Sequence, residues 1–330
     1  MNRILKSLWI KISVAAVLLT WLLVRSEPDK IFNALRSLPM SLFLCLLILY
    51  VFSFAVNACK WRFLLQGQPF WRLFRLILVA NYYSLIMPGQ VAGEAVKVVR
   101  LSRETSNPGS IAASVAFDRF TGLMSILLVT FVGLAFGSAS DVFPFWSGYL
   151  LVPAVFLCSP ILLRSRSVAR GLKKALLRAR GLIHGRYSRK FWPHAFGFID
   201  ACRRYCMHPQ RLAGAILLGI LLQGICIGIV MVLGEHFDIH LNFIDWCWVF
   251  GLVSLVVFVP VSIGGIGLRE GGFVFCLLVF GIAEEKALAL SIALFSLQLT
   301  SALVGALFEF GLCTAQRYEF DFKRLSPNSS

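Results

Sequence analysis

A proline and a cluster of glycines interrupt the most apolar part of this sequence. The run from 246 to 283 is apolar at both ends, but residues 259–272 read Val-Pro-Val-Ser-Ile-Gly-Gly-Ile-Gly-Leu-Arg-Glu-Gly-Gly. Proline removes a backbone donor and clashes with the preceding helical turn, and glycine lowers the cost of an irregular backbone. Such a break is tolerated at membrane depth only where protein or a water-filled cavity surrounds it. Arg269 and Glu270 add two ionisable groups to this setting, where such groups are costly and usually functional.

The composition places this break in a membrane. The chain of 330 residues is 58% hydrophobic and 15% charged, with a mean hydropathy of +0.79, whereas a soluble domain is about 25% charged. We therefore predict an all-α, polytopic integral membrane bundle that forms a single domain over residues 1–330.

The net charge of +16 is concentrated in one segment. Residues 164–211 hold 13 Lys or Arg residues and one acid, Asp200. A basic loop between apolar spans is the positive-inside signature, so we predict that this loop is cytoplasmic and expect no nucleic-acid partner. Val168, Leu172 and Leu176 recur at helical spacing, which leaves open an amphipathic helix on the inner leaflet or a solvated loop.

A weaker break lies earlier, at 87–94, where the sequence reads Met-Pro-Gly-Gln-Val-Ala-Gly-Glu. The arm before it, 73–87, would make about 22 Å of helix, which is short for a hydrocarbon core of about 30 Å. The arms of the later break, 246–259 and 271–283, are short in the same way. Full spans are expected at 8–24, 41–58, 111–137, 148–163, 212–233 and 286–313.

Counting crossings gives the expected topology. We predict about six full transmembrane helices and two re-entrant or broken helical hairpins of opposite orientation, about eight hydrophobic segments in all. Lys60-Trp61-Arg62 is interpreted as a cytoplasmic interface with an aromatic anchor, and residues 25–40 as a mixed-charge loop. The predicted parts are an N-terminal half 1–163 with its break at 87–94, the cytoplasmic basic loop 164–211, a C-terminal half 212–316 with its break at 259–272, and a cytoplasmic tail 317–330. The N-terminus is also expected in the cytoplasm.

Paired interrupted segments in corresponding halves indicate a transporter site near the membrane midplane. The two breaks share proline, glycine and a carboxylate, but not their spacing. Internal duplication is therefore left open at this point.

Two stretches resemble the signatures of the lysylphosphatidylglycerol synthetase transmembrane family, also called the flippase-like family. The stretches are Asn81-Tyr82-Tyr83 through Met87–Glu94 with Lys97, Arg100 and Ala116-Phe117-Asp118-Arg119, and then Pro260 through Glu270. Ala92 stands where the family often has a second glycine, which alters little. Members that synthesise aminoacylated lipids carry a soluble transferase domain after the membrane part. Because this sequence stops at Ser330, the resemblance implies the lipid-translocating module alone.

The ionisable residues near the two breaks form the predicted site. A charge at the bilayer centre costs about 2.5–3.5 kcal/mol, so these residues must compensate one another or line a wet groove. Arg119 and Arg269 are expected to meet phosphate, for which the guanidinium is geometrically suited. The alternative is that Asp118–Arg119 and Arg269–Glu270 are structural pairs that pin the hairpins. The predicted substrate-binding residues are Asn81, Tyr82, Pro88, Gly89, Gly93, Glu94, Lys97, Arg100, Asp118, Arg119, Pro260, Gly264, Gly265, Gly267, Arg269 and Glu270.

These residues and the resemblance together predict a flippase-like transporter rather than an enzyme. We expect it to move an anionic or glycosylated (phospho)lipid between the leaflets of a bacterial or archaeal cytoplasmic (inner) membrane, with membrane lipids as partners and no cofactor. A homodimer and a separate lipid-modifying enzyme are left open as partners.

Two other functions stay open on the sequence. One is an intramembrane lipid-modifying enzyme with Glu94, Asp118 or Glu270 as a general base. The other is a non-catalytic partner of a lipid or envelope-glycan synthesis enzyme. None of the histidines lies in an apolar span near a carboxylate, so no catalytic residue is predicted. Neither His236 with His240 nor Cys202, Cys206 and His208 offers a complete ligand set, and no metal is expected.

Overall fold

The computed structural model describes residues 28–86, 91–102, 108–138, 198–258 and 265–325, with a few isolated residues between 149 and 174. The expected span at 8–24, nearly all of 148–163 and most of the basic loop lie outside these ranges. The labelled helices are α2 (Pro28–Arg36), α3 (Met40–Leu64), α4 (Phe70–Ile86), α5 (Val91–Ser102), α6 (Pro108–Phe136), α11 (Pro209–His236), α12 (Phe243–Phe258), α13 (Leu268–Leu278) and α14 (Glu284–Leu325).

Four of these helices are long and apolar enough to cross a membrane. They are Met40–Leu64, Pro108–Phe136, Pro209–His236 and Glu284–Phe310, and each overlaps nearly all of one expected span. The predicted all-α, multi-pass bundle is therefore confirmed for the part of the chain that the structure describes.

The structure differs from the prediction at two places near the ends of the chain. Residues 28–36 form the helix α2 where a mixed-charge loop was expected. The last helix continues to Leu325, so most of the expected tail 317–330 is helical. Both of these segments contain charged residues. They were not predicted to be helical because the helices were assigned from apolar runs.

Both predicted breaks separate short helices. α4 and α5 have 17 and 12 residues, and α12 and α13 have 16 and 11. None of these arms exceeds about 26 Å at 1.5 Å per residue, so each falls short of a hydrocarbon core of about 30 Å. The two arms of each pair pack on one another. The interruptions are thus confirmed as two-armed hairpins, α4–α5 and α12–α13.

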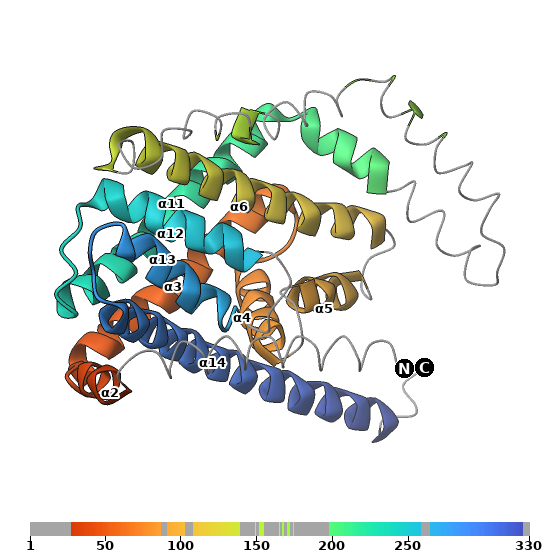
Figure 1. Cartoon of the computed structure of the whole chain (residues 1–330). Helices are drawn as coiled ribbons and strands as arrows, with labels where there is room; N and C mark the ends of the chain where they lie inside the picture. Colours follow the sequence, from red (N-terminus) through yellow and green to blue (C-terminus); the bar gives the residue numbers. More distant parts are fainter. Residues whose placement is uncertain are drawn as a thin grey trace, which may run out of the picture.

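The described helices repeat one order twice, in which a long span, two short arms and a long span follow each other. The first unit is α3 to α6 and the second is α11 to α14. The first arm of each hairpin packs on the last span of the other unit, α4 on α14 and α12 on α6 (Figure 1). The first spans, α3 and α11, pack on each other.

Glycine contacts give the relative direction of the paired helices. A Cβ on Gly214, near the start of α11, would lie 3.0 Å from the ring of Phe63, near the end of α3. Tyr50, near the middle of α3, lies close to Cys226, further along α11. The two first spans are therefore antiparallel. Equivalent helices that run in opposite directions are the mark of an inverted repeat, so helix order and packing support the duplication that the sequence left open.

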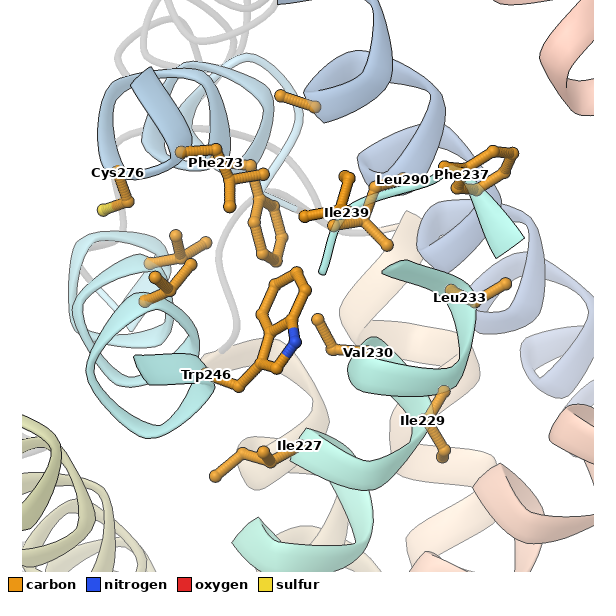
Figure 2. Packing of buried hydrophobic residues seen from close by; sticks show 14 of the residues in the cluster. Ile227, Ile229, Val230, Leu233, Phe237, Ile239, Trp246, Phe273, Cys276 and Leu290 are labelled. Carbon is orange, nitrogen blue, oxygen red and sulfur yellow. The ribbon is translucent and has the colours of Figure 1, made fainter. Parts of the chain in front are cut away.

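Trp246, at the start of the second hairpin, anchors the larger hydrophobic core. Its indole is fully buried and lies beside Val230 of α11 and Phe273 of α13 (Figure 2). Gly234 comes so close to this ring that a Cβ there would lie 2.5 Å from it. The second hairpin is thus packed tightly against the long helices on either side of it.

We predict that Gly305→Ala lowers the midpoint of thermal unfolding. A Cβ at Gly305 would lie 2.2 Å from the carbonyl oxygen of Leu78, so α14 could no longer pack closely on α4. Overpacking of this kind costs about 1–3 kcal/mol. Thermal unfolding of the purified protein in detergent measures the change.

Gly224→Ala is the matched control, because a Cβ there would meet no other described part of the protein within 4 Å. This substitution should leave stability unchanged or raise it by up to about 1 kcal/mol through helix propensity. Equal unfolding midpoints for the two variants would show that α4 and α14 do not pack as described.

Candidate functional site

A cavity of about 380 Å³ opens between the two hairpins. Its walls come from both units, with residues of α3, α5 and α6 on one side and residues of α11, α12, α13 and α14 on the other. The charged residues that line it are Lys60, Glu94, Lys97, Asp118, Arg119 and Arg269. The structure thus brings together charged residues from the two breaks, which are far apart in the sequence.

Asp118 of α6 is held by two lysines. Lys60 Nζ lies 3.0 Å from Asp118 Oδ1 and donates a hydrogen bond to the Asp118 carbonyl oxygen, also at 3.0 Å. Lys97 Nζ lies 3.7 Å from Asp118 Oδ2. All three residues are at most 5% exposed. A buried charge that loses such partners typically costs about 3–5 kcal/mol, so these contacts hold α3, α5 and α6 together.

Glu94, in the first turn of α5, shares one oxygen between two cations. Its Oε1 lies 2.7 Å from Arg119 Nη2 and 3.2 Å from Lys97 Nζ. Glu94 and Lys97, three residues apart, therefore lie on one face of α5. The other oxygen, Oε2, is buried without a hydrogen-bond partner among the residues that the structure describes. Lys97 also lies 5.2 Å from the centre of the Trp61 ring, within reach of a cation–π interaction.

Arg269 and Glu270 in the second hairpin have different roles. Arg269 lines the cavity, donates to Gln298 Oε1 of α14 at 2.5 Å and lies 5.7 Å from the Phe295 ring centre. Glu270 is 3% exposed and does not line the cavity.

Glu270 instead fixes the start of α13. Its Oε2 accepts the Gly267 N–H at 2.5 Å, and its Oε1 accepts the Ser291 hydroxyl at 3.2 Å. Gly267 has a φ of +83°, which favours glycine. The N–H that the break would leave unpaired is therefore satisfied within the protein.

The hydrogen bonds and ion pairs of these residues are made with partners other than the sequence neighbours of the alternative interpretation, although Arg119 still acts electrostatically on Asp118, and Glu270 on Arg269. Asp118 contacts the lysines while Arg119 contacts Glu94. Arg269 contacts Gln298 and Glu270 caps Gly267. Adjacent residues on a helix do not face each other, so each member of these dipeptides finds a partner on another element or turn.

Three predicted site residues lie at the contact between the first hairpin and α14. Asn81 donates to Ser301 Oγ at 3.1 Å, and Tyr82 lies against Gly305. Arg100 forms an ion pair with Glu309, which also accepts the Tyr83 hydroxyl at 3.1 Å. None of the three lines the cavity.

The predicted glycines are placed by packing and by backbone conformation. A Cβ on Gly93 would lie 2.4 Å from the Ala80 carbonyl oxygen, so Gly93 lets α5 pack closely on α4. Gly265 has a φ of +82°, and a Cβ there would lie 3.4 Å from Arg269 Nη2. The remaining predicted positions, Pro88, Gly89, Pro260 and Gly264, lie outside the described residues.

Sequence reasoning missed one charged residue of the cavity. Lys60 and Trp61 were interpreted as an interface anchor, and this is wrong, because they are 3% and 0% exposed and face α5 and α6. The sequence contained a sign of this, because the polar residue Asn57 lies one helical turn before Lys60. Both residues line the cavity. Gln223 and Gln298 line it as well.

Over the described ranges, no three His, Cys, Asp or Glu residues are placed to hold a metal ion. Burial, with a smaller effect of the neighbouring Cys206, raises the pKa of the Cys202 thiol to about 12. A protonated thiol is a poor metal ligand and a poor nucleophile.

In comparison with known families, residues 8–305 match the model described as Lysylphosphatidylglycerol synthase TM region. The match includes both hairpins and every charged residue that lines the cavity. No curated protein and no solved structure matches the chain.

We predict that Lys60 and Asp118 are strongly coupled. Lys60→Met removes the nearer of the two lysines at Asp118, and Asp118→Asn leaves the buried Lys60 without a carboxylate, so each should lower stability by about 3 kcal/mol. The double variant should lose clearly less than the sum of the two. Thermal unfolding of the four proteins gives the coupling directly.

Arg62→Met provides the control, since Arg62 is exposed and lies on the same helix. It should change stability by less than about 0.5 kcal/mol. Additive losses for Lys60→Met and Asp118→Asn would contradict the ion pair.

Proposed function

The chain belongs to the family of the lysylphosphatidylglycerol synthase transmembrane region, and from that premise we propose that it moves an anionic phospholipid between the two leaflets of a membrane. In this proposal the head group passes through the cavity between the hairpins, and the acyl chains stay in the hydrocarbon. Family membership itself supports the coarser statement that this is a multi-pass membrane protein involved in lipid handling.

The charge of the cavity is the observation that carries the proposal. Four cationic side chains and two carboxylates line it, and the buried Glu270 also acts electrostatically on Arg269, so the positive charges outnumber the negative ones by one. Such an excess in a low-dielectric setting is compensated by an anion, and arginine binds phosphate oxygens with two parallel hydrogen bonds. Arg119 from the first unit and Arg269 from the second both face this space. A phosphodiester between them would contact both halves of the protein.

The repeat supplies a way to move that anion. Inverted units around a central site are typical of transporters that open alternately to each side. The long helix α14 contacts both hairpins, through Ser301 with Asn81 of the first and Gln298 with Arg269 of the second. A shift of one hairpin against α14 would therefore change the contacts between α14 and the other hairpin.

The carboxylates favour transport over catalysis. A general base must be able to reach and take a proton from the substrate. Glu94 and Asp118 are each in contact with cations, and Glu270 caps Gly267 away from the cavity. The proposal therefore includes no catalytic residue and requires no cofactor.

The proposed location is the cytoplasmic membrane of a bacterium or archaeon, with both termini in the cytoplasm. The concentration of Lys and Arg in residues 164–211 supports this orientation.

We predict that Arg119→Gln and Arg269→Gln each slow translocation of a head-group-intact fluorescent phosphatidylglycerol by at least about tenfold. Loss of one charge-assisted contact to phosphate is worth about 1.5–3 kcal/mol, which corresponds to this factor or more. The assay follows loss of the inner-leaflet label in proteoliposomes after an impermeant quencher has removed the outer-leaflet label.

Arg62→Gln, an exposed arginine outside the cavity, should transport at the wild-type rate. Unfolding midpoints of all variants verify that they remain folded. Normal flux through both cavity-arginine variants, above that of protein-free liposomes, would end the proposal.

A further inference from the structure

A second pocket, of about 180 Å³, lies apart from the cavity between the hairpins, and the two have no lining residue in common. Leu64, the last residue of α3, lines it together with Ser110 and Arg211, the third residues of α6 and α11. The helical segment 198–206, just before α11, provides another wall. Because α3, α6 and α11 are each long and apolar enough to cross a membrane, this interface pocket lies at the boundary between hydrocarbon and water.

The interface pocket is basic. Arg204, His208 and Arg211 line it, and no Asp or Glu does. Neither guanidinium forms an ion pair with a residue that the structure describes, and Asp200, one helical turn before Arg204, does not line the pocket. Both arginines act electrostatically on the hydroxyl of Tyr205, another lining residue, so they face the same space. Two cations held near each other repel, and an anion between them removes this cost.

Phosphate is the anion that fits these donors. Arginine binds phosphate oxygens through two parallel hydrogen bonds, and His208 and Gln66 add N–H donors at the wall. The first turns of α6 and α11 border the pocket, where helix dipoles favour negative charge.

The size of the interface pocket limits what enters it. A volume of about 180 Å³ holds about six waters at about 30 Å³ each. That is room for one phosphate group, but it is below the roughly 300–1,000 Å³ of a typical small-molecule site. The remainder of a larger ligand must therefore extend out of the pocket.

A larger cavity shows where that remainder lies. This cavity of about 640 Å³ adjoins the interface pocket, since Gln66 and Arg211 line both. It continues along α3 to Phe63 and Cys59, both of which are exposed, and Cys59 lies about 7.5 Å further into the span than Leu64. The combined space thus leads from a basic pocket at the boundary toward the hydrocarbon. A phospholipid has the same layout, with its phosphate at the boundary and its apolar part in the membrane.

We propose that the interface pocket is a second binding site, which holds the phosphate of an anionic phospholipid from the adjoining leaflet against Arg204, His208 and Arg211. Basic pockets between transmembrane helices on the cytoplasmic side are suited to anionic lipid head groups. The bound lipid connects the helical segment 198–206 to the ends of three spans, and it is separate from a lipid that passes through the central cavity.

The test measures lipid binding after the central cavity has been disabled. The full chain carrying Arg119→Gln and Arg269→Gln is titrated in detergent with dihexanoyl phosphatidylglycerol and, separately, with dihexanoyl phosphatidylcholine. Both lipids have a phosphate and the same tails, but the choline cation would be repelled by the arginines of the interface pocket. Phosphatidylglycerol should bind at least about tenfold more tightly.

Further substitutions in this protein locate the preference. Arg204→Gln and Arg211→Gln should each lower the affinity for phosphatidylglycerol by at least about tenfold. Lys174→Gln is the control, because Lys174 is an exposed cation of the same basic loop that does not line the pocket, and it should leave the affinity unchanged. Inorganic phosphate should bind at least about tenfold more weakly than the lipid, because it has no apolar part to bury.

Photolabelling of wild-type protein tests the same site without any substitution. A phosphatidylglycerol with a photoreactive group in its upper acyl chain should label peptides that contain residues 59–66 or 204–211. The matching phosphatidylcholine should label them at least about tenfold less.

The outcomes separate this inference from the proposed function. Equal binding of the two lipids after the cavity has been disabled, equal labelling by both, or no labelling of these peptides would refute the interface site and leave the cavity proposal standing. Inorganic phosphate that binds as tightly as phosphatidylglycerol would show a site for free phosphate and overturn the lipid assignment. Wild-type binding that depends on Arg204 and Arg211 but not on Arg119 and Arg269 would support the interface site and contradict the cavity.

Discussion

Every backbone and ionic group that enters the hydrocarbon must find its partner inside the protein, and both hairpins depend on this constraint. Breaking a helix at membrane depth exposes N–H groups that lipid cannot satisfy. At the second break, Glu270 accepts one of these N–H groups, from Gly267, and is itself held by Ser291 of α14. After the first break, the negatively charged Glu94 forms an ion pair with Arg119 of α6. In both cases the first turn after the break is tied to the long helix that follows it.

This constraint also explains why the two breaks meet. Each arm of the two hairpins is shorter than the hydrocarbon core is thick. The first arm of each hairpin packs on the last span of the opposite unit, and residues of both second arms, α5 and α13, line one cavity. Protein and the cavity, rather than lipid, then surround the polar groups. The charged cavity is thus a consequence of the inverted repeat.

The excess of positive charge is the part of this arrangement that stability alone does not explain. Four cations line the cavity, whereas two carboxylates line it and a third, Glu270, acts on Arg269 from outside the lining. A purely structural network would be expected to balance, because a buried charge without compensation is costly. The imbalance is accounted for if an anion regularly occupies the space.

Much of this architecture could be predicted from the sequence, because apolar length and helix-breaking residues are local signals. Pro88 and Pro260 marked the ends of α4 and α12 to within a few residues, and four spans were predicted close to their observed positions. Partners were not predictable in this way. Lys60 was interpreted as a surface residue because it lies near the end of a span, but Asp118, which it contacts, is 58 residues away.

Arg100 shows the opposite error. Because Arg100 follows the first break closely in the sequence, it was predicted to belong to the substrate site. In the structure it forms an ion pair with Glu309, on α14 of the other unit. Which helices pack on which is decided by shape, at positions such as Gly93, Gly214 and Gly305. A single sequence indicates that such glycines are needed but not which helix each one contacts.

The central claim, that the two hairpins enclose one positively charged and water-accessible cavity, can be tested at Cys226, which lines the cavity. In a variant whose other cysteines are replaced by serine or alanine, modification of Cys226 by an anionic methanethiosulfonate is compared with that by a cationic one. Both reagents attack the same thiol, so the ratio of rates reports the local electrostatic potential. The account predicts that the anionic reagent reacts at least about tenfold faster. A faster reaction with the cationic reagent, or no reaction with either, would contradict it.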